Sequence, residues 1–159
     1  MDINIISVGK IKEKYFTDGI DEYKKRLLPF CKVNFIELKD EQTPAKISEK
    51  DIKIILDKEG SRILEKIRDK DYVIVLDLKG KNIDSISFAN EIHKLMAHGT
   101  SSIVFIIGGS LGLSDEVKKR GNCSLSFSKF TFPHKLMKLI LMEQIYRAFT
   151  IINKMPYHK

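Results

Sequence analysis

The sequence lacks the features that mark secreted, metal-binding and membrane proteins. Its only cysteines, Cys31 and Cys123, lie far apart and form no metal-binding or redox motif. We expect both to be small buried side chains in a reducing cytoplasm. The four histidines show no H-x-x-x-H spacing, so no catalytic metal is expected. No apolar run approaches the roughly 18 residues of a membrane span, and no signal-peptide pattern opens the chain, so no membrane partner is expected.

The composition indicates one globular domain with a basic surface. The chain has 159 residues and a hydrophobic fraction of 43%, which is ordinary for a globular protein. It contains no internal repeat, no low-complexity segment and no linker, so we expect a single domain over residues 1–159. The formal net charge of +7 favours a polyanionic partner, although a charge count does not locate the charges.

Segments with strand and helix spacing alternate five times along the chain. This order predicts an α/β fold with a mainly parallel five-stranded sheet and helices on both faces. Gly60 lies inside an expected helix, where it indicates either a break or a close packing contact. The expected strands cover residues 3–9, 33–38, 72–78 (followed by a turn at 79–81), 102–107 and 123–127, and the expected helices cover 14–28, 48–67, 85–98, a short segment after Ser114 and a final segment opened by Pro133.

The final helix has more apolar residues than one core requires. Glu143, Arg147, Thr150 and Lys154 follow at steps of four, three and four, so they form one narrow polar stripe. Apolar residues take most of the remaining circumference, whereas packing on one core needs an arc of only about 100°. We expect the second apolar face to be buried in a two-fold homodimer. The alternative is a helix held between the sheet and another helix of the same chain.

Two loops in the second half of the chain predict the walls of one small-molecule site. The apolar run at residues 103–107 ends at Gly108 and Gly109, as a buried parallel strand does where it opens onto a crevice. Residues 126–134 alternate small and aromatic side chains and lead into the final helix. The glycine loop matches neither the G-x-G-x-x-G fingerprint nor a Walker motif, so a simple tight turn is the alternative.

An ordered set of short motifs resembles one family. The set comprises Val8-Gly9-Lys10, Lys58-Glu59-Gly60, Leu76-Asp77-x-x-Gly80-Lys81, Gly108-Gly109-Ser110-x-Gly112, Leu125-Ser126-Phe127-Ser128, Thr131-Phe132-Pro133-His134, Glu143-Gln144-x-Tyr146-Arg147-Ala148 and Tyr157-His158-Lys159. No single motif is specific, but the ordered set is. In their order and over the whole chain, the motifs resemble those of the large-subunit rRNA pseudouridine N3-methyltransferase (methyltransferase H) family of the SPOUT superfamily.

The resemblance implies a fold and a cofactor. The fold would be a five-stranded α/β domain whose C-terminal part forms a trefoil knot, a topology that a count of strands does not suggest. The cofactor would be S-adenosylmethionine, which is bound in the knot of an obligate homodimer. Carried over by position, the cofactor-binding residues would be Leu76, Gly108, Phe127, Ser128, Lys129, Phe130, Thr131 and Phe132.

The resemblance also implies a substrate, a pseudouridine of 23S rRNA that is methylated at N3 in the assembled ribosome. We expect one protomer to supply the cofactor while the other grips rRNA phosphates. His134, Tyr157 and His158 are expected to lie around the target base. Arg147 and Lys159 are expected to orient the RNA.

Each of these assignments has a plainer alternative. His134 would otherwise be a capping or solvated residue, and the C-terminal Tyr-His-Lys a frayed end. Glu143 and Arg147 would otherwise form an i,i+4 surface ion pair. Two other classes of function are also open, a nucleotide-binding regulatory domain and a non-catalytic ribosome-binding factor.

Overall fold

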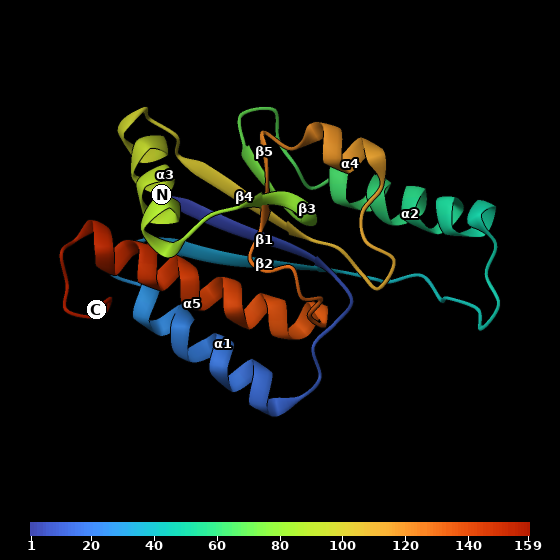
Figure 1. Ribbon diagram of the computed structural model, residues 1–159, viewed down its shortest axis with the longest axis horizontal. Helices are drawn as coiled ribbons and strands as arrows, with labels where there is room; N and C mark the ends of the chain where they lie inside the picture. The colour runs from blue at the N-terminus through green and yellow to red at the C-terminus, as the bar shows by residue number, and fades with distance from the viewer.

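The computed structural model describes residues 1–159 as a single α/β domain in which strands and helices alternate (Figure 1). The order of the elements along the chain confirms the predicted succession. Their bounds differ from the predicted ones by a few residues at several ends. The elements are β1 (Asp2–Val8), α1 (Lys14–Leu27), β2 (Lys32–Leu38), α2 (Glu49–Leu64), β3 (Tyr72–Asn82), α3 (Ser85–Ala97), β4 (Ser102–Ile107), α4 (Asp115–Arg120), β5 (Cys123–Ser126) and α5 (His134–Ile152).

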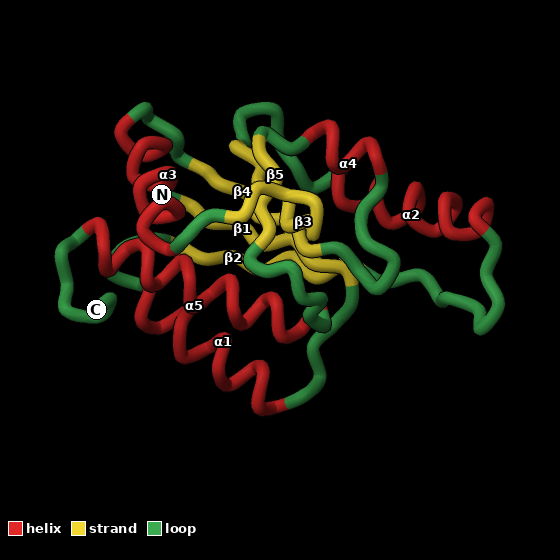
Figure 2. The backbone as a smooth tube through the Cα atoms, in the orientation of Figure 1, coloured by secondary structure: helices red, strands yellow, loops and turns green.

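The five strands, drawn in yellow in Figure 2, form one sheet. Their order is β2-β1-β4-β3-β5, and every pair is parallel. Helices α1, α3 and α5 cover one face of the sheet, and α2 and α4 cover the other (Figure 1). The predicted fold class is therefore confirmed. Because all strands run in the same direction, their carboxyl ends meet at one edge.

Strand β4 lies at the centre of the sheet and contributes to both cores. All six of its residues are buried. Ile103, Phe105 and Ile107 belong to the core under α1, α3 and α5. Val104 and Ile106 belong to the core under α2 and α4. Burial on both faces explains why this strand is an uninterrupted apolar run.

The predicted turn at residues 79–81 is wrong, because β3 continues to Asn82. Leu125 of β5 pairs first with Leu76 and then, after an irregularity in the register, with Lys81. Gly80 permits this close wrapping, since a Cβ at that position would lie 2.6 Å from the carbonyl carbon of Leu125. The end of β3 therefore bends around β5, which is compatible with a knot nearby. The trefoil knot itself stays a prediction.

Helix α5 packs between α1 and α3 on one face of the sheet (Figure 1). The ring of Phe149 stacks on Phe30 with 5.6 Å between centroids, and Gln144 accepts a hydrogen bond of 2.7 Å from Ser85. Helix α5 is thus held between other elements of its own chain, which is the alternative to burial in a dimer. The homodimer stays a prediction. No helix of the protein is both long and apolar enough to cross a membrane.

Gly60 marks a close packing contact and not a break. Helix α2 runs without interruption through this position. A Cβ on Gly60 would lie 2.3 Å from Oγ of Ser114, the residue whose side chain caps α4. The glycine therefore lets α2 pack against the start of α4, next to the loop that follows β4.

We predict that Gly60→Ala destabilises the protein by about 1–3 kcal/mol, because the added methyl group overpacks the contact with Ser114. The loss is expected even though alanine is favoured over glycine by about 1 kcal/mol within a helix. Thermal unfolding of the variant measures the effect, with Ser61→Ala on the exposed side of α2 as the control. An unfolding midpoint equal to or above that of the wild type would show that the contact is not tight.

Candidate functional site

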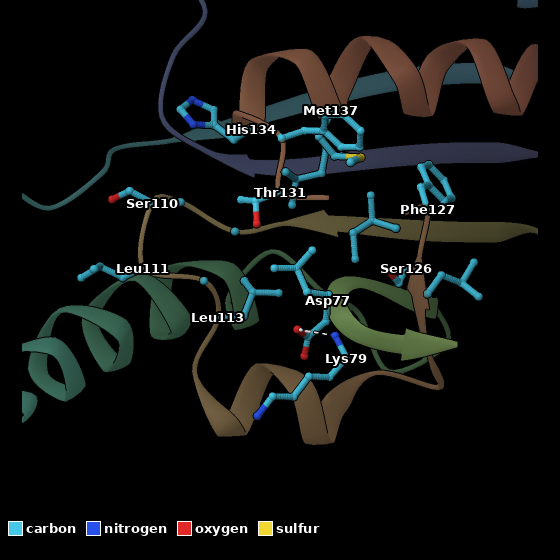
Figure 3. A pocket seen from close by; sticks show the side chains of 18 of the residues that line it. Asp77, Lys79, Ser110, Leu111, Leu113, Ser126, Phe127, Thr131, His134 and Met137 are labelled. Carbon is cyan, nitrogen blue, oxygen red and sulfur yellow. Dashed lines mark hydrogen bonds between the residues drawn. The ribbon is translucent and has the colours of Figure 1, made fainter. Parts of the chain in front are cut away.

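A crevice of ≈ 990 Å³ opens at the carboxyl ends of β3, β4 and β5 (Figure 3). This is the edge where parallel α/β sheets bind ligands, and the volume suits a small molecule. Its walls are the end of β3 at 76–79, the loop at 107–113 after β4, and the segment 125–134 that joins β5 to α5. The two loops that the sequence predicted as walls of one site therefore face each other across this crevice.

The glycine loop after β4 is a tight turn that also lines the crevice. A Cβ on Gly108 would lie 2.6 Å from the carbonyl oxygen of Gly112, and Gly112 itself has φ +91°. Gly109 and Gly112 form an isolated antiparallel bridge. The turn needs glycine at these positions because side chains would block its closure or strain its backbone. The loop is therefore both a tight turn and a wall of the crevice, so the two alternatives given for it are compatible.

The segment between β5 and α5 is held by hydrogen bonds of its own. Ser126 Oγ donates to the carbonyl of Ser128 at 2.9 Å, and the N–H of Phe130 donates to Ser128 Oγ at 3.0 Å. Asn82 at the end of β3 donates to the carbonyl of Ser126 at 2.9 Å. Of the eight residues predicted to bind the cofactor, all but the exposed Lys129 line the crevice.

The sequence prediction missed a charged pair at the crevice. Lys118 Nζ lies 2.9 Å from Oδ2 of Asp77, and both residues line the wall. Burial opposes ionisation of Asp77, but the Lys118 ammonium and the backbone N–H of Lys79 outweigh it and hold the pKa of this carboxyl below its usual value. Asp77 directly follows Leu76, which was predicted to bind the cofactor. This position was a signal that could have added Asp77 to the predicted site.

His134 lies at the end of the crevice, in the first turn of α5 (Figure 3). Its ring packs over Gly9, where a Cβ would lie 3.0 Å from Nε2 of the imidazole. Nε2 is buried and has no hydrogen-bond partner. Burial and then the neighbouring Lys135 lower the pKa of His134, so the imidazole is neutral at pH 7. It is neither a side-chain cap nor a fully solvated residue.

The tail cluster, defined by Glu143, Arg147, Tyr157 and His158, lies against the second half of α5. The Arg147 guanidinium donates from Nη2 and Nε to Oε1 of Glu143 at 2.6 and 3.0 Å. The Tyr157 hydroxyl donates to the same oxygen at 3.2 Å, and the guanidinium lies 4.8 Å from the Tyr157 ring centroid. His158 Nδ1 lies 3.2 Å from Arg147 Nη1. The alternative of a frayed tail is therefore wrong for Tyr157 and His158.

Within one chain, the predicted catalytic residues form two separate groups. Arg147, Tyr157 and His158 come together in the tail cluster, whereas His134 lies at the crevice. Along α5, the 9 to 13 residues that separate His134 from Glu143 and Arg147 correspond to about 14–20 Å. Lys159 is exposed beyond the cluster. The Glu143 carboxylate links the cluster, because Arg147 and Tyr157 both donate to it. Its i,i+4 spacing to Arg147 was the only signal of that role in the sequence.

The fold and the crevice are those of an open α/β domain, a class of protein that binds small molecules at the carboxyl edge of a parallel sheet. Comparison with known proteins gives the family. A family model described as a predicted SPOUT methyltransferase matches residues 1–158. The chain therefore belongs to the SPOUT methyltransferase family, as the motifs predicted.

Several relatives align with the full chain, and the alignment covers 100% of each relative as well. A protein of Clostridium botulinum (strain Alaska E43 / Type E3) is 60% identical to it over 159 residues. Proteins of Clostridioides difficile (strain 630) and Bacillus pumilus (strain SAFR-032) are 56% and 55% identical over the same length. All three are named ribosomal RNA large subunit methyltransferase H.

We predict that Tyr157 ionises about two pH units later than a free tyrosine. Burial, and after it the neighbouring Tyr23 and the Glu143 carboxylate, raise its pKa to about 12. Docking of Tyr157 therefore stabilises the fold below about pH 10, and this contribution is lost as the pH rises towards about 12. The difference in phenolate absorbance between the wild type and Tyr157→Phe measures the transition. A midpoint near pH 10 would mean that the tail is solvated.

Proposed function

We propose that this chain transfers the methyl group of S-adenosylmethionine to N3 of a pseudouridine in the 23S rRNA of the assembled ribosome. The observation that carries the proposal is the crevice, because it gathers all but one of the positions that the family resemblance assigns to the cofactor. The names of the full-length relatives support large-subunit rRNA as the substrate. No observation favours a regulatory domain or a non-catalytic ribosome-binding factor.

The residues of the crevice fit an adenosyl compound. The wall combines apolar side chains with the exposed backbone of two loops, as expected where an adenine ring is covered on its faces and held at its edge by backbone groups. Segment 127–132 would hold the adenine, and Leu76 would cover one face. Gly108 allows the tight turn that forms one wall of the crevice, because a Cβ there would meet Gly112 and Leu113. When bound, the cofactor supplies an activated methyl group on its sulfonium.

The chemistry requires an attacking nitrogen about 3 Å from the methyl carbon and in line with the departing sulfur. It also requires an acceptor for the proton of N3. His134 suits the region around the target base, because its imidazole is neutral and lies where the crevice meets the first turn of α5. Tyr157 and His158 supply further polar groups for the base, and Arg147 and Lys159 supply positive charge for the RNA.

These groups can meet only if a second copy of the chain takes part. Along α5, Glu143 and Arg147 of the tail cluster lie about 14–20 Å from His134 at the crevice of their own chain. We therefore propose a homodimer in which the tail of one protomer reaches the crevice of its partner. One protomer then supplies the cofactor while the other positions the base and grips rRNA phosphates. The many lysines and arginines of this basic chain suit that second role.

We predict transfer of a labelled methyl group from S-adenosylmethionine to 23S rRNA in ribosomes that lack the modification. Separated subunits and naked rRNA, run beside intact ribosomes, show whether the assembled particle is required. Mass spectrometry of the labelled nucleotide then checks for N3-methylpseudouridine. An unlabelled 23S rRNA in ribosomes, with cofactor binding confirmed, would contradict the proposed substrate.

Removal of residues 157–159 is predicted to abolish methyl transfer while leaving cofactor affinity nearly unchanged, because the tail lies far from the crevice of its own chain. Gly108→Val should instead lose cofactor affinity and, with it, methyl transfer, since even a Cβ would lie 2.6 Å from the carbonyl oxygen of Gly112. Methyl transfer and calorimetric binding of S-adenosylhomocysteine measure the two effects.

Mixed dimers decide whether the tail acts on the partner. Co-expression of the truncated chain and the Gly108→Val chain with different affinity tags gives a dimer with one intact crevice and one intact tail. If the tail reaches the partner's crevice, this mixed dimer recovers activity that neither homodimer has. If the mixed dimer is inactive, the tail does not work across the interface.

A further inference from the structure

Phe130 is the most exposed of the large hydrophobic side chains of the protein, with 79% of its surface in water. It nevertheless lines the crevice, so its ring lies at the rim and not in the interior. Leu78, which is 56% exposed, is a second apolar side chain of the same rim. Leaving such groups in water forgoes the favourable free energy of burial, unless a partner covers them.

The exposure of Phe130 is built into the loop. The Ser126 hydroxyl donates to the carbonyl of Ser128, and the Ser128 hydroxyl accepts from the N–H of Phe130. These two bonds fix the backbone on the amino side of Phe130. By contrast, Phe127 of the same loop is half-buried, and its ring packs edge-on against Phe88 with 6.0 Å between centroids. One loop thus directs one aromatic ring inward and another outward.

The surroundings of Phe130 carry positive charge. Lys129, next to it in the chain, is exposed, and neither it nor Lys79 on the rim forms an ion pair. An exposed aromatic ring beside an unpaired lysine is a combination that single-stranded nucleic acids bind, because the ring stacks on a base while the ammonium group contacts a phosphate.

We propose that Phe130 is a stacking platform for an unpaired base of the RNA substrate at the mouth of the crevice. This assignment rests on the proposed function. The backbone of Phe130 still belongs to the cofactor loop, but its ring serves the RNA. The platform gives the domain a contact that holds a base next to the methyl donor.

Three substitutions separate stacking from simple burial. Phe130→Trp keeps an aromatic face, Phe130→Leu keeps apolar volume without one, and Phe130→Ala removes both. We expect the tryptophan variant to keep a KM for ribosomes close to that of the wild type. The leucine and alanine variants should raise this KM about tenfold or more, with a much smaller change in kcat. Ile86→Ala, at an exposed apolar position of α3 outside the crevice, is the control and should leave KM unchanged.

The tryptophan variant also tests the two competing partners, because the wild-type chain contains no tryptophan. Its emission should change more on binding of ribosomes than on addition of S-adenosylhomocysteine, and the affinity of each variant for that compound should change much less than its KM for ribosomes. Sedimentation equilibrium should give the same oligomeric state for every variant.

Each alternative outcome overturns the assignment. A leucine variant as efficient as the wild type would exclude stacking. Quenching by S-adenosylhomocysteine together with a loss of its affinity would place the ring on the cofactor. Dissociation of the leucine or alanine variant would place it in a protein interface. A wild type that methylates no ribosomal RNA would refute the proposed function itself, and the platform with it.

Discussion

The burial of β4 on both faces is the constraint on which the rest of the structure depends. This strand contributes to the two cores at once and therefore fixes helices on each side of the sheet. Its neighbours β1 and β3 run parallel to it, so all carboxyl ends meet at one edge. A strand buried in this way must leave the sheet by a compact turn, and Gly108 and Gly112 make that turn possible. The crevice is the space that this turn leaves at the edge.

Helix α5 connects the crevice to the tail cluster. Its first turn borders the crevice, and its second half, from Glu143 to Arg147, holds the tail cluster. Ion pairs from its amino-terminal half bind it to other parts of the chain: Lys138, which is buried, pairs with Glu37 of β2, and Lys135 pairs with Glu13 before α1. The helix is therefore a fixed spacer between two groups of polar residues, and this rigidity is the physical reason for invoking a second protomer in catalysis.

The sequence predicted the strand order along the chain, the two faces and the two loops of the crevice, because hydrophobic periodicity and glycine positions report directly on burial and turns. It could not predict the path of β3 beyond Leu78, since the pairing of Lys81 with Leu125 is a long-range contact with no local signal. The role of Gly60 was open for the same reason, because the atom that it avoids belongs to Ser114, far away in the chain. The family resemblance supplied the eight expected cofactor positions. The fold brings all of them except Lys129 to one crevice. Lys129 lies off the wall because its side chain follows the exposed side of the loop.

The central claim is that the carboxyl edge of the sheet binds S-adenosylmethionine. The most direct measurement is a titration of the backbone amide resonances of the protein with S-adenosylhomocysteine, followed by nuclear magnetic resonance. The account predicts saturable shifts concentrated at residues 76–79, 108–113 and 126–134, which form the walls of the crevice. A second cavity between α3 and β5, lined by Tyr72, Phe88 and Cys123 among others, should show none. Shifts confined to that cavity, or no shifts at saturating ligand, would contradict the account.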